Sequence, residues 1–490
     1  RETVRPIRTV EPVFRDGRYG AEAAEDFRNR TLSTGDSVVL DFGDHETGYL
    51  TIRFSSAGAH PDAPVWIRVR FAERLSEFYE NAGAYAGWIS KAWIQETQAH
   101  LDVLPCEVTF PRRYAFRYVK LEVLDCSSRF SLTMEEASAS AVSSADESAL
   151  TPCTSTDPEL AELDRIAVRT LHECMQKVFE DGPKRDRRLW MGDLRLEALA
   201  CYETYHANDM VKQGLYLFAG DTNAEGQIAS NLFIAPQIEA DDGRMFDYSL
   251  FFTTTLRDYY AETKDQEALE DLYDTAIRQV ELAAALLGAD GVIRDSDVMG
   301  WCFVDWNLGL NKQASAQGIY LYALLAAARL AEWKGDPKQA ASFLQRHDDG
   351  VRAVRKALWD YERGLFVSGD IRQVSWASQC WLVLGGAFAS REEAAAALLS
   401  LEQDKNAEGM VTPYMYHHYI QALIDVGLEE KAKVVLKAYW GGMAADGADT
   451  FFELYRPGHP DESPYGGTIV NSYCHAWSCA PAYFIRHYQW

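Results

Sequence analysis

The spacing of the apolar residues changes once along this 490-residue chain, and the change limits the folds that the chain can adopt. Over the first ~135 residues, short apolar runs with partial alternation are separated by Gly, Pro and Asp, which is typical of β-strands. The clearest runs are Ser37–Phe42, Tyr49–Phe54, Val65–Phe71 and Tyr118–Leu124. Strands of this length at regular intervals predict an N-terminal antiparallel β-sandwich.

A stretch of small and polar residues, Ala137–Thr156, follows these strands and predicts a linker between two domains. Beyond it the apolar spacing becomes helical. We therefore expect a multidomain β + α chain, with a β-sandwich at 1–140, a linker at 141–157 and a helical domain at 158–490.

The helical part begins with a clear start signal, because Asp157 offers an N-cap and Pro158 fits the first helical position. About twelve helices are expected after it. The clearest are Leu269–Leu287, Ala314–Lys334, Pro337–Leu358, Glu392–Leu401, Pro413–Val426 and Glu429–Trp440. Their number favours an (α/α)6 barrel with a funnel at one end. An irregular helical repeat is the alternative, but the sequence shows no fixed period to support it.

The composition restricts the class of ligand. A formal net charge of −25 argues against nucleic acid and anionic membrane surfaces, since no basic stripe is present to bind phosphates. No run of eighteen apolar residues exists, so no transmembrane helix and no membrane partner are predicted. An ordered, acidic chain with 12% aromatic residues fits an enzyme acting on a neutral ligand.

The nine cysteines indicate free thiols rather than disulfides or a metal site. Their number is odd, and none lies in a C-x-x-C pair or a Cys/His finger. We expect no metal and no organic cofactor. A reducing compartment such as the cytoplasm is favoured, while a secreted or periplasmic location and assembly into a homo-oligomer stay open.

The segment Asp181–Asp193, DGPKRDRRLWMGD, carries the strongest functional signal. It gathers three carboxylates, four cations and Trp190 into thirteen residues, and its Gly-Pro and Gly positions predict a loop. Carboxylates beside a tryptophan are typical of sugar chemistry, where an acid protonates the leaving oxygen and an aromatic face packs on the ring. A loop made rigid by its own salt bridges is the alternative.

This loop resembles the signature Asp-Cys-Pro-x-Arg-Glu…Gly-Trp-x-Gly-Asp of the bacterial α-L-rhamnosidases of glycoside hydrolase family 78. Seven other segments resemble the same family, in the same order along the chain. These segments are Val38–Phe54 and Phe116–Leu124, similar to its β-sandwich, and Phe246–Phe252, Phe303–Asn307, Thr412–Ala432, Ala448–Tyr455 and Asn471–Trp477, similar to its barrel. The resemblance covers nearly the whole chain and implies a hydrolase that removes terminal α-L-rhamnose with inversion.

The resemblance also implies roles for individual residues. It makes Asp186 the general acid and Glu453 the general base, ~270 residues later in the sequence. The positions that it assigns to substrate binding are Asp181, Asp193, Asp247, Asp305, Trp306 and His475. We add Arg185 and Trp190 from the loop, and Trp301, because Trp301 and Trp306 flank Asp305 and favour stacking on a sugar.

Two departures from the family pattern leave alternatives open. Asp186 stands where the family has glutamate and is one methylene shorter. It is then the acid in a shifted loop, or Glu197 or another carboxylate replaces it, or the chemistry has changed. The loop is also unusually basic at Arg185, Arg187 and Arg188, which suits a uronic acid in the glycone or its neighbour. Pairing of these arginines with local aspartates is the other explanation.

The sequence thus predicts an inverting glycosidase that releases α-L-rhamnose or a closely related sugar. A polysaccharide lyase acting on a rhamnosyl-glucuronate polymer, on the same helical toroid, is the first alternative. A non-catalytic sugar-binding protein is the second. The neighbouring His417 and His418 are interpreted as one buried and one exposed histidine on different helix faces, not as metal ligands.

Overall fold

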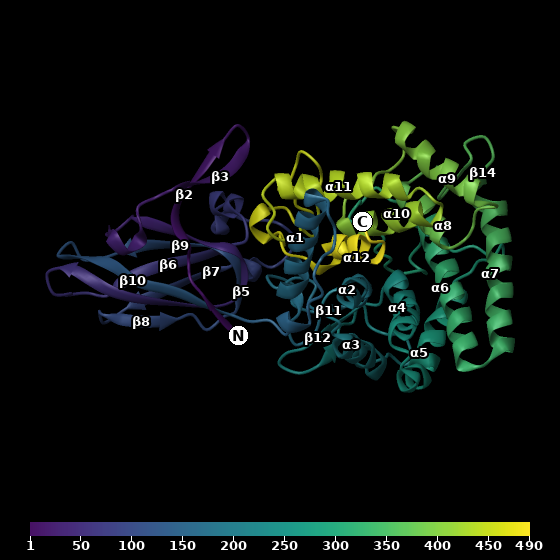
Figure 1. Cartoon of the computed structure of the whole chain (residues 1–490), viewed down its shortest axis with the longest axis horizontal. Helices are drawn as coiled ribbons and strands as arrows, with labels where there is room; N and C mark the ends of the chain where they lie inside the picture. The colour runs from purple at the N-terminus through teal and green to yellow at the C-terminus, as the bar shows by residue number, and fades with distance from the viewer.

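The computed structural model describes residues 1–490, with a β-sheet formed by the N-terminal part and helices formed by the rest (Figure 1). The strands of the N-terminal part are β1 Glu2–Val4, β2 Arg8–Arg15, β3 Arg18–Ala23, β4 Thr31–Leu32, β5 Ser37–Gly58, β6 Val65–Ala72, β7 Glu96–Leu101, β8 Cys106–Thr109, β9 Tyr114–Asp125 and β10 Phe130–Ala141. They form one antiparallel sheet whose main path runs β1-β10-β5-β9-β6-β7. A cluster of 24 buried apolar residues forms its core.

The strand β5 corrects the sequence prediction, which divided it into two strands. It runs without a break through the polar residues 43–46, and its register against β9 shifts between Asp41 and Glu46. The buried Asp41 pairs with Arg8 at 2.7 Å and with Arg117 at 3.0 Å. Within the stretch itself, His45 pairs with Glu73 at 2.9 Å and Glu46 with Arg169 at 3.0 Å, so the polar residues are satisfied inside the protein and the strand continues with an irregularity.

The predicted linker is also partly strand. Strand β10 extends to Ala141, and Ala137 and Ala139 alternate into the core, so small residues here follow a β period. The helical start signal is confirmed, because the Asp157 side chain accepts hydrogen bonds from the backbone N–H groups of Glu159 and Leu160.

The helical part contains twelve α-helices, which agrees with the predicted number. They are α1 Pro158–Cys174, α2 Met191–Glu203, α3 Asn208–Gly220, α4 Phe246–Thr263, α5 Gln266–Ala284, α6 Gln313–Lys334, α7 Pro337–Leu358, α8 Trp376–Leu384, α9 Arg391–Ser400, α10 Pro413–Asp425, α11 Glu429–Ala445 and α12 Ala480–His487. Five short strands lie in the segments between helices: β11 Leu189–Trp190, β12 Asn231–Phe233, β13 Glu239–Ala240, β14 Trp359–Asp360 and β15 Leu365–Phe366. No helix has the length and apolar character needed to span a bilayer.

Alternate helices pack side by side in a series. Helix α2 contacts α4, α4 contacts α6, α6 contacts α8, and α8 contacts α10. The 3-10 turn η8 at Ala476–Ser478 contacts both α10 and α2. The helices α5, α7, α9 and α11 each contact members of this series, and a cluster of 101 buried residues forms the core of the helical part. The loops before α2, α4, α6 and η8 therefore meet, and residues from these loops and from the first turns of α2 and α4 line one pocket.

The prediction for His417 and His418 was wrong, since both side chains are buried. Helix α10 packs against α8 and α11 and contacts η8, so neither of these positions faces solvent. The His418 ring lies 4.2 Å from the Trp381 ring, and the His417 ring lies 4.9 Å from that of Phe484. Burial lowers the pKa of both imidazoles well below the usual value, so both are neutral core residues.

The sheet and the helices are joined by ion pairs that reach the loop before α2. Lys184 of this loop is fully buried, and its Nζ lies 2.5 Å from Glu77 Oε2 and 3.8 Å from Glu73 Oε2. Both glutamates follow β6 in the sheet domain. Glu73 also accepts a hydrogen bond from the backbone N–H of Tyr473, at 2.7 Å. The N-terminal domain therefore holds two loops of the helical domain in place.

We expect Lys184→Met to destabilise the protein by about 3–5 kcal/mol, because it leaves the buried Glu77 carboxylate without its cation, while Glu73 keeps His45 at 2.9 Å. The measurement is the midpoint of thermal unfolding, which should fall by several degrees. The double variant Lys184→Met/Glu77→Gln should recover part of this loss, because it also removes the unpaired charge. Equal midpoints for Lys184→Met and the unmodified protein would contradict this role of Lys184.

Candidate active site

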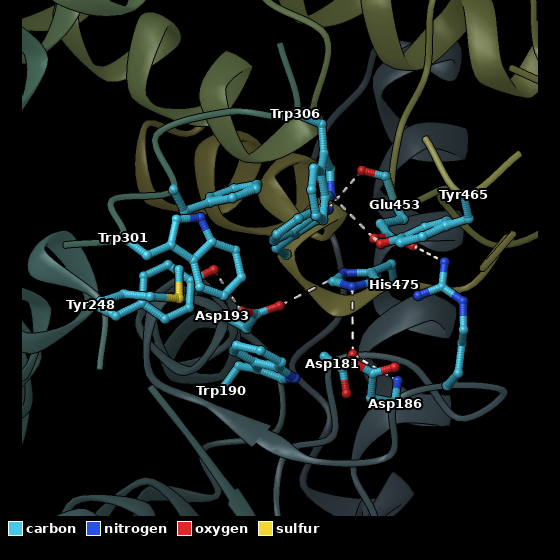
Figure 2. A pocket seen from close by; sticks show the side chains of 14 residues that line it. Asp181, Asp186, Trp190, Asp193, Tyr248, Trp301, Trp306, Glu453, Tyr465 and His475 are labelled. Carbon is cyan, nitrogen blue, oxygen red and sulfur yellow. Dashed lines mark hydrogen bonds and ion pairs between the residues drawn. The ribbon is translucent and has the colours of Figure 1, made fainter. Parts of the chain in front are cut away.

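A small cavity of about 50 Å³ lies where these loops meet, and nine of the eleven predicted site residues line it (Figure 2). Its lining residues are Asp181, Arg185, Asp186, Trp190, Asp193, Met245, Tyr248, Trp301, Phe303, Trp306, Glu453, Tyr465, His475 and Trp477. They come from segments nearly 300 residues apart in the sequence. The fold thus brings the first loop and the late Glu453 segment to one place, as the family resemblance implied.

Glu453 is buried and held by three donors from different segments. Arg185 Nη2 donates to Glu453 Oε2 at 2.6 Å, while Trp306 Nε1 and the Tyr465 hydroxyl donate to Oε1, the former at 3.3 Å. The Trp477 indole N–H also binds the Glu453 backbone carbonyl, at 2.9 Å. The carboxylate is therefore fixed in position and compensated by a buried cation.

Arg185 is itself fixed by two contacts besides Glu453. Its Nε donates to the Val470 carbonyl at 2.6 Å, and its guanidinium carbon lies 3.9 Å from the centre of the Tyr465 ring. Burial acts to lower the pKa of Arg185, but the neighbouring Glu453 and Tyr465 raise it above the usual value. Arg185 thus stays charged and directed at Glu453.

Asp181 and Asp193 lie on either side of His475 in Figure 2. His475 Nε2 is 3.8 Å from Asp181 Oδ2, and His475 Nδ1 is 3.8 Å from Asp193 Oδ1. Burial raises the pKa of both carboxyls well above the usual value, and for Asp181 the neighbouring Asp186 and Asp193 raise it further. Burial and the Arg185 charge lower the pKa of His475 well below its usual value. This group can therefore donate and accept hydrogen bonds without a net positive charge.

Asp181 also shapes the loop that carries Asp186. Its carboxyl oxygens accept hydrogen bonds from the backbone N–H groups of Asp186, at 2.8 Å, and Arg188, at 3.1 Å. Its own carbonyl accepts from the Ala476 N–H at 2.9 Å, which joins the loop to the His475 segment. The carboxyl group that the sequence suggested for sugar binding therefore also sets the backbone geometry around Asp186.

The Asp186 carboxyl makes no hydrogen bond within the protein and is partly exposed. Burial raises its pKa, although the nearby Arg185 and Arg188 act to lower it. In Figure 2 it lies on the opposite side of the pocket from Glu453. One carboxyl without internal partners thus faces a second that is held by three donors.

Asp193 corrects the prediction that the whole Asp181–Asp193 segment is a loop, because it lies in the first turn of α2. Gly192 is also helical, although glycine usually disfavours helices. A Cβ atom at Gly192 would lie 2.3 Å from the Tyr248 ring, so this position allows close packing of α2 against α4. The packing brings the Tyr248 hydroxyl to Asp193 Oδ2 at 3.2 Å.

Asp247 and Asp305, which the sequence assigned to substrate binding, are not among the residues that line this cavity. Asp247 Oδ2 accepts hydrogen bonds from the backbone N–H groups of Phe303 and Val304, at 3.0 and 2.9 Å. Asp305 accepts from the Thr412 hydroxyl at 2.6 Å and the Val411 N–H at 2.9 Å. Because their oxygens are occupied inside the protein, these two carboxylates hold the loop that carries Trp301 and Trp306.

Aromatic side chains form most of the remaining wall. Trp190 packs edge-on against Tyr248, and its buried indole N–H has no partner in the protein. Trp306 packs edge-on against Phe303, while Trp301 is 47% exposed and lies at the rim. Flat apolar walls with isolated polar groups are typical of sugar-binding pockets.

Sequence reasoning missed Tyr465, Tyr248, Phe303, Met245 and Trp477 as pocket residues. Tyr248 and Phe303 lie within or beside segments that had been singled out, so neighbouring positions were the available signal. For Tyr465 the only signal in the sequence was the pair of glycines that follows it, Gly466 and Gly467. A Cβ at Gly87 would lie 1.9 Å from the Tyr465 carbonyl, so this loop is packed tightly against the N-terminal domain.

The three arginines of the Asp181–Asp193 segment have different partners. Arg185 binds Glu453, and Arg188 lies 3.6 Å from Asp241. Arg187 donates only to the backbone carbonyls of Lys184 and Arg113. Neither Asp181 nor Asp186 pairs with these arginines, so the predicted local pairing is largely absent. No group of three or more His, Cys, Asp or Glu side chains is arranged to hold a metal ion.

Two family models match the chain. Residues 4–141 match the glycosyl hydrolase family 78 alpha-rhamnosidase N-terminal domain, and residues 150–488 match the bacterial alpha-L-rhamnosidase 6 hairpin glycosidase domain. A comparison with curated protein sequences gave no match.

Several solved structures are similar to this one. A rhamnosidase from Klebsiella oxytoca with rhamnose bound is 47% identical, with a TM-score of 0.97 over 100% of this chain and 96% of that one. A family 78 rhamnosidase of Bacillus sp. GL1 is 20% identical, with a TM-score of 0.78 over 95% of this chain and 49% of that one. A Streptomyces avermitilis α-L-rhamnosidase complexed with L-rhamnose is 18% identical, with a TM-score of 0.68 over 94% of this chain and 43% of that one.

Proposed function

Because the chain belongs to the bacterial α-L-rhamnosidases of glycoside hydrolase family 78, we propose that it hydrolyses glycosides that end in α-L-rhamnose or a closely related sugar. The observation that carries the proposal is the small pocket in which Glu453, held by Arg185, faces Asp186. The similarity to a rhamnosidase with rhamnose bound, over the whole chain, supports rhamnose as the sugar in this pocket.

The architecture that we propose is a β-sandwich at 1–140, a linker at 141–157 and an (α/α)6 barrel at 158–490. The series α2, α4, α6, α8 and α10 supports the barrel, because η8 contacts its first and last members and α5, α7, α9 and α11 each contact members of the series. In such a barrel the pocket lies at one end of the inner helices, which agrees with its position before α2 and α4.

The reaction that we propose is a single displacement with inversion. Asp186 donates a proton to the leaving oxygen while Glu453 takes a proton from the water that attacks the sugar carbon. Such enzymes place the two carboxyl groups ~6.5–9.5 Å apart, so that water fits between base and sugar. The surroundings suit these roles, since burial raises the pKa of Asp186 and no internal donor occupies its oxygens.

The shorter side chain of Asp186 is compatible with a tightly closed loop. A Cβ atom at Gly182 would lie 2.6 Å from the Arg185 carbonyl, so the loop approaches itself more closely than a larger residue at this position permits. Glu197 is fully buried and does not line the pocket, which supports Asp186 in preference to Glu197 as the acid. The shifted loop is therefore the explanation that we retain for Asp186.

The sugar itself would be held by the polar group around His475. His475 Nδ1 and the buried Trp190 N–H have no hydrogen-bond partner in the protein, and Asp193 accepts a hydrogen bond from the Tyr248 hydroxyl at Oδ2 only. Ring hydroxyls would satisfy these atoms, while Trp306 offers an apolar face. The lyase alternative loses support, because the pocket arginine Arg185 is already occupied by Glu453 and Val470 and is not free to neutralise a uronate.

We expect Glu453→Gln to lower kcat by about 100- to 10,000-fold, because the amide cannot accept a proton from water. Release of nitrophenol from nitrophenyl α-L-rhamnoside measures the rate, and circular dichroism checks the fold. Glu430→Gln, at an exposed position of α11, is the matched control and should keep full activity. A Glu453→Gln variant with near-normal kcat would remove Glu453 from the role of base.

Asp186→Asn should separate substrates by their leaving group. We expect a loss of about 100- to 10,000-fold on rhamnosyl disaccharides and a much smaller loss on nitrophenyl rhamnoside, whose leaving group needs little protonation. Since Asp186 must hold a proton to act, wild-type activity should fall as the pH rises through its pKa. This decline should be absent in Asp186→Asn. An equal loss on both substrates would indicate binding instead of proton donation.

A further inference from the structure

A second cavity, of about 870 Å³, lies between the N-terminal sheet and the helical domain and shares Asp186 with the sugar pocket. Its walls come from the β8–β9 turn, the segment after α1, the Asp181–Asp193 segment and β12. Because Asp186 borders both spaces, the bond that it protonates would lie between them. The group that leaves with the protonated oxygen would then extend into this second cavity, which we call the basic cleft.

The basic cleft is lined mainly by positive charges, whereas the whole chain has a negative net charge. Its lining includes five arginines and one lysine but only two carboxylates, in a protein with a net charge of −25. One carboxylate, Glu180, is neutralised by a two-pronged contact with Arg113, at 3.1 and 2.6 Å. The other is Asp186, which the proposed reaction needs in its protonated form.

Four of the cations in the basic cleft have no carboxylate partner, namely Arg1, Arg112, Lys177 and Arg187. Arg112 donates only to the Ala92 carbonyl, at 3.3 Å, and Arg187 donates only to two carbonyls. Lys177 is exposed and makes no ion pair. Burial and the neighbouring Arg113 and Arg112 lower the pKa of Arg187 to about 10, which reflects the crowding of like charges. An anion in the cleft would relieve this repulsion.

Aromatic groups accompany these charges. The Arg188 guanidinium lies 4.1 Å from the centre of the Phe233 ring, and Trp93 lies at another part of the wall. The cleft therefore combines cations with apolar faces, which suits a charged sugar better than a small inorganic anion.

We propose that the basic cleft binds the leaving group and that this group is a uronic acid, so that the substrate is an α-L-rhamnosyl uronate. Its carboxylate would be bound by Arg112, Lys177 and Arg187, while its glycosidic oxygen receives the proton of Asp186. Hydrolysis adds water across the glycosidic bond and yields rhamnose and the free uronic acid. The inference rests on the proposed rhamnosidase activity and adds the chemical class of its leaving group.

The test compares two disaccharides that differ only in this charge, rhamnosyl-glucuronate and rhamnosyl-glucose with the same linkage. For the unmodified protein, kcat/KM should be about 10- to 100-fold higher for the glucuronate, because hydrogen bonds to a charged group add roughly 1.5–3 kcal/mol. The preference should shrink as sodium chloride is raised, since the cleft is partly exposed and its ion pairs are screened.

Arg112→Gln and Lys177→Gln should each lower kcat/KM for the glucuronate and leave that for the glucose compound unchanged. Lys405→Gln removes the same charge from an exposed position outside the cleft and serves as the matched control. Equal kcat/KM values for the two disaccharides, or equal effects of the variants on both, would overturn the inference. Activity on nitrophenyl rhamnoside in the same samples would show that the rhamnosidase function itself still holds.

Discussion

The buried ion pair between Arg185 and Glu453 is the interaction on which the rest of the site depends. It joins the loop before α2 to a loop 268 residues later in the sequence. Removal of one partner would leave an unpaired charge in the interior, at a cost of about 3–5 kcal/mol. The sequence between these two loops forms ten α-helices, α2 to α11. The pair therefore holds the pocket together and also orients the carboxylate opposite Asp186.

The two candidate catalytic carboxyls differ because their surroundings differ. Glu453 receives hydrogen bonds from Arg185, Trp306 and Tyr465, whereas Asp186 receives none through its side chain. Burial raises the pKa of Asp186, which favours its protonated form. One pocket can provide both an acid and a base when the surroundings suit one carboxyl to donate a proton and the other to accept one. The N-terminal domain takes part, because Glu73 and Glu77 hold Lys184, two residues before Asp186.

Much of this arrangement could be predicted from the sequence, since local motifs carry it. The period change located the strands and helices, and the Asp181–Asp193 segment and the Glu453 segment were identified by their residues. The sequence could not show where carboxyl oxygens point. Asp247 and Asp305 have the right residue type in the right motifs, yet backbone N–H groups occupy their oxygens. Tyr465 lies in a loop without a motif, and only the tertiary contact with Glu453 gives it a role.

The most direct test of an Asp186 acid and a Glu453 base is the anomeric form of the sugar when it is first released. Proton nuclear magnetic resonance can follow hydrolysis of an aryl α-L-rhamnoside at an enzyme concentration high enough to outpace mutarotation. Attack by a water molecule that Glu453 activates predicts β-L-rhamnose as the first product, with the α form appearing later. Initial release of α-L-rhamnose would contradict a single displacement and would require a covalent intermediate instead.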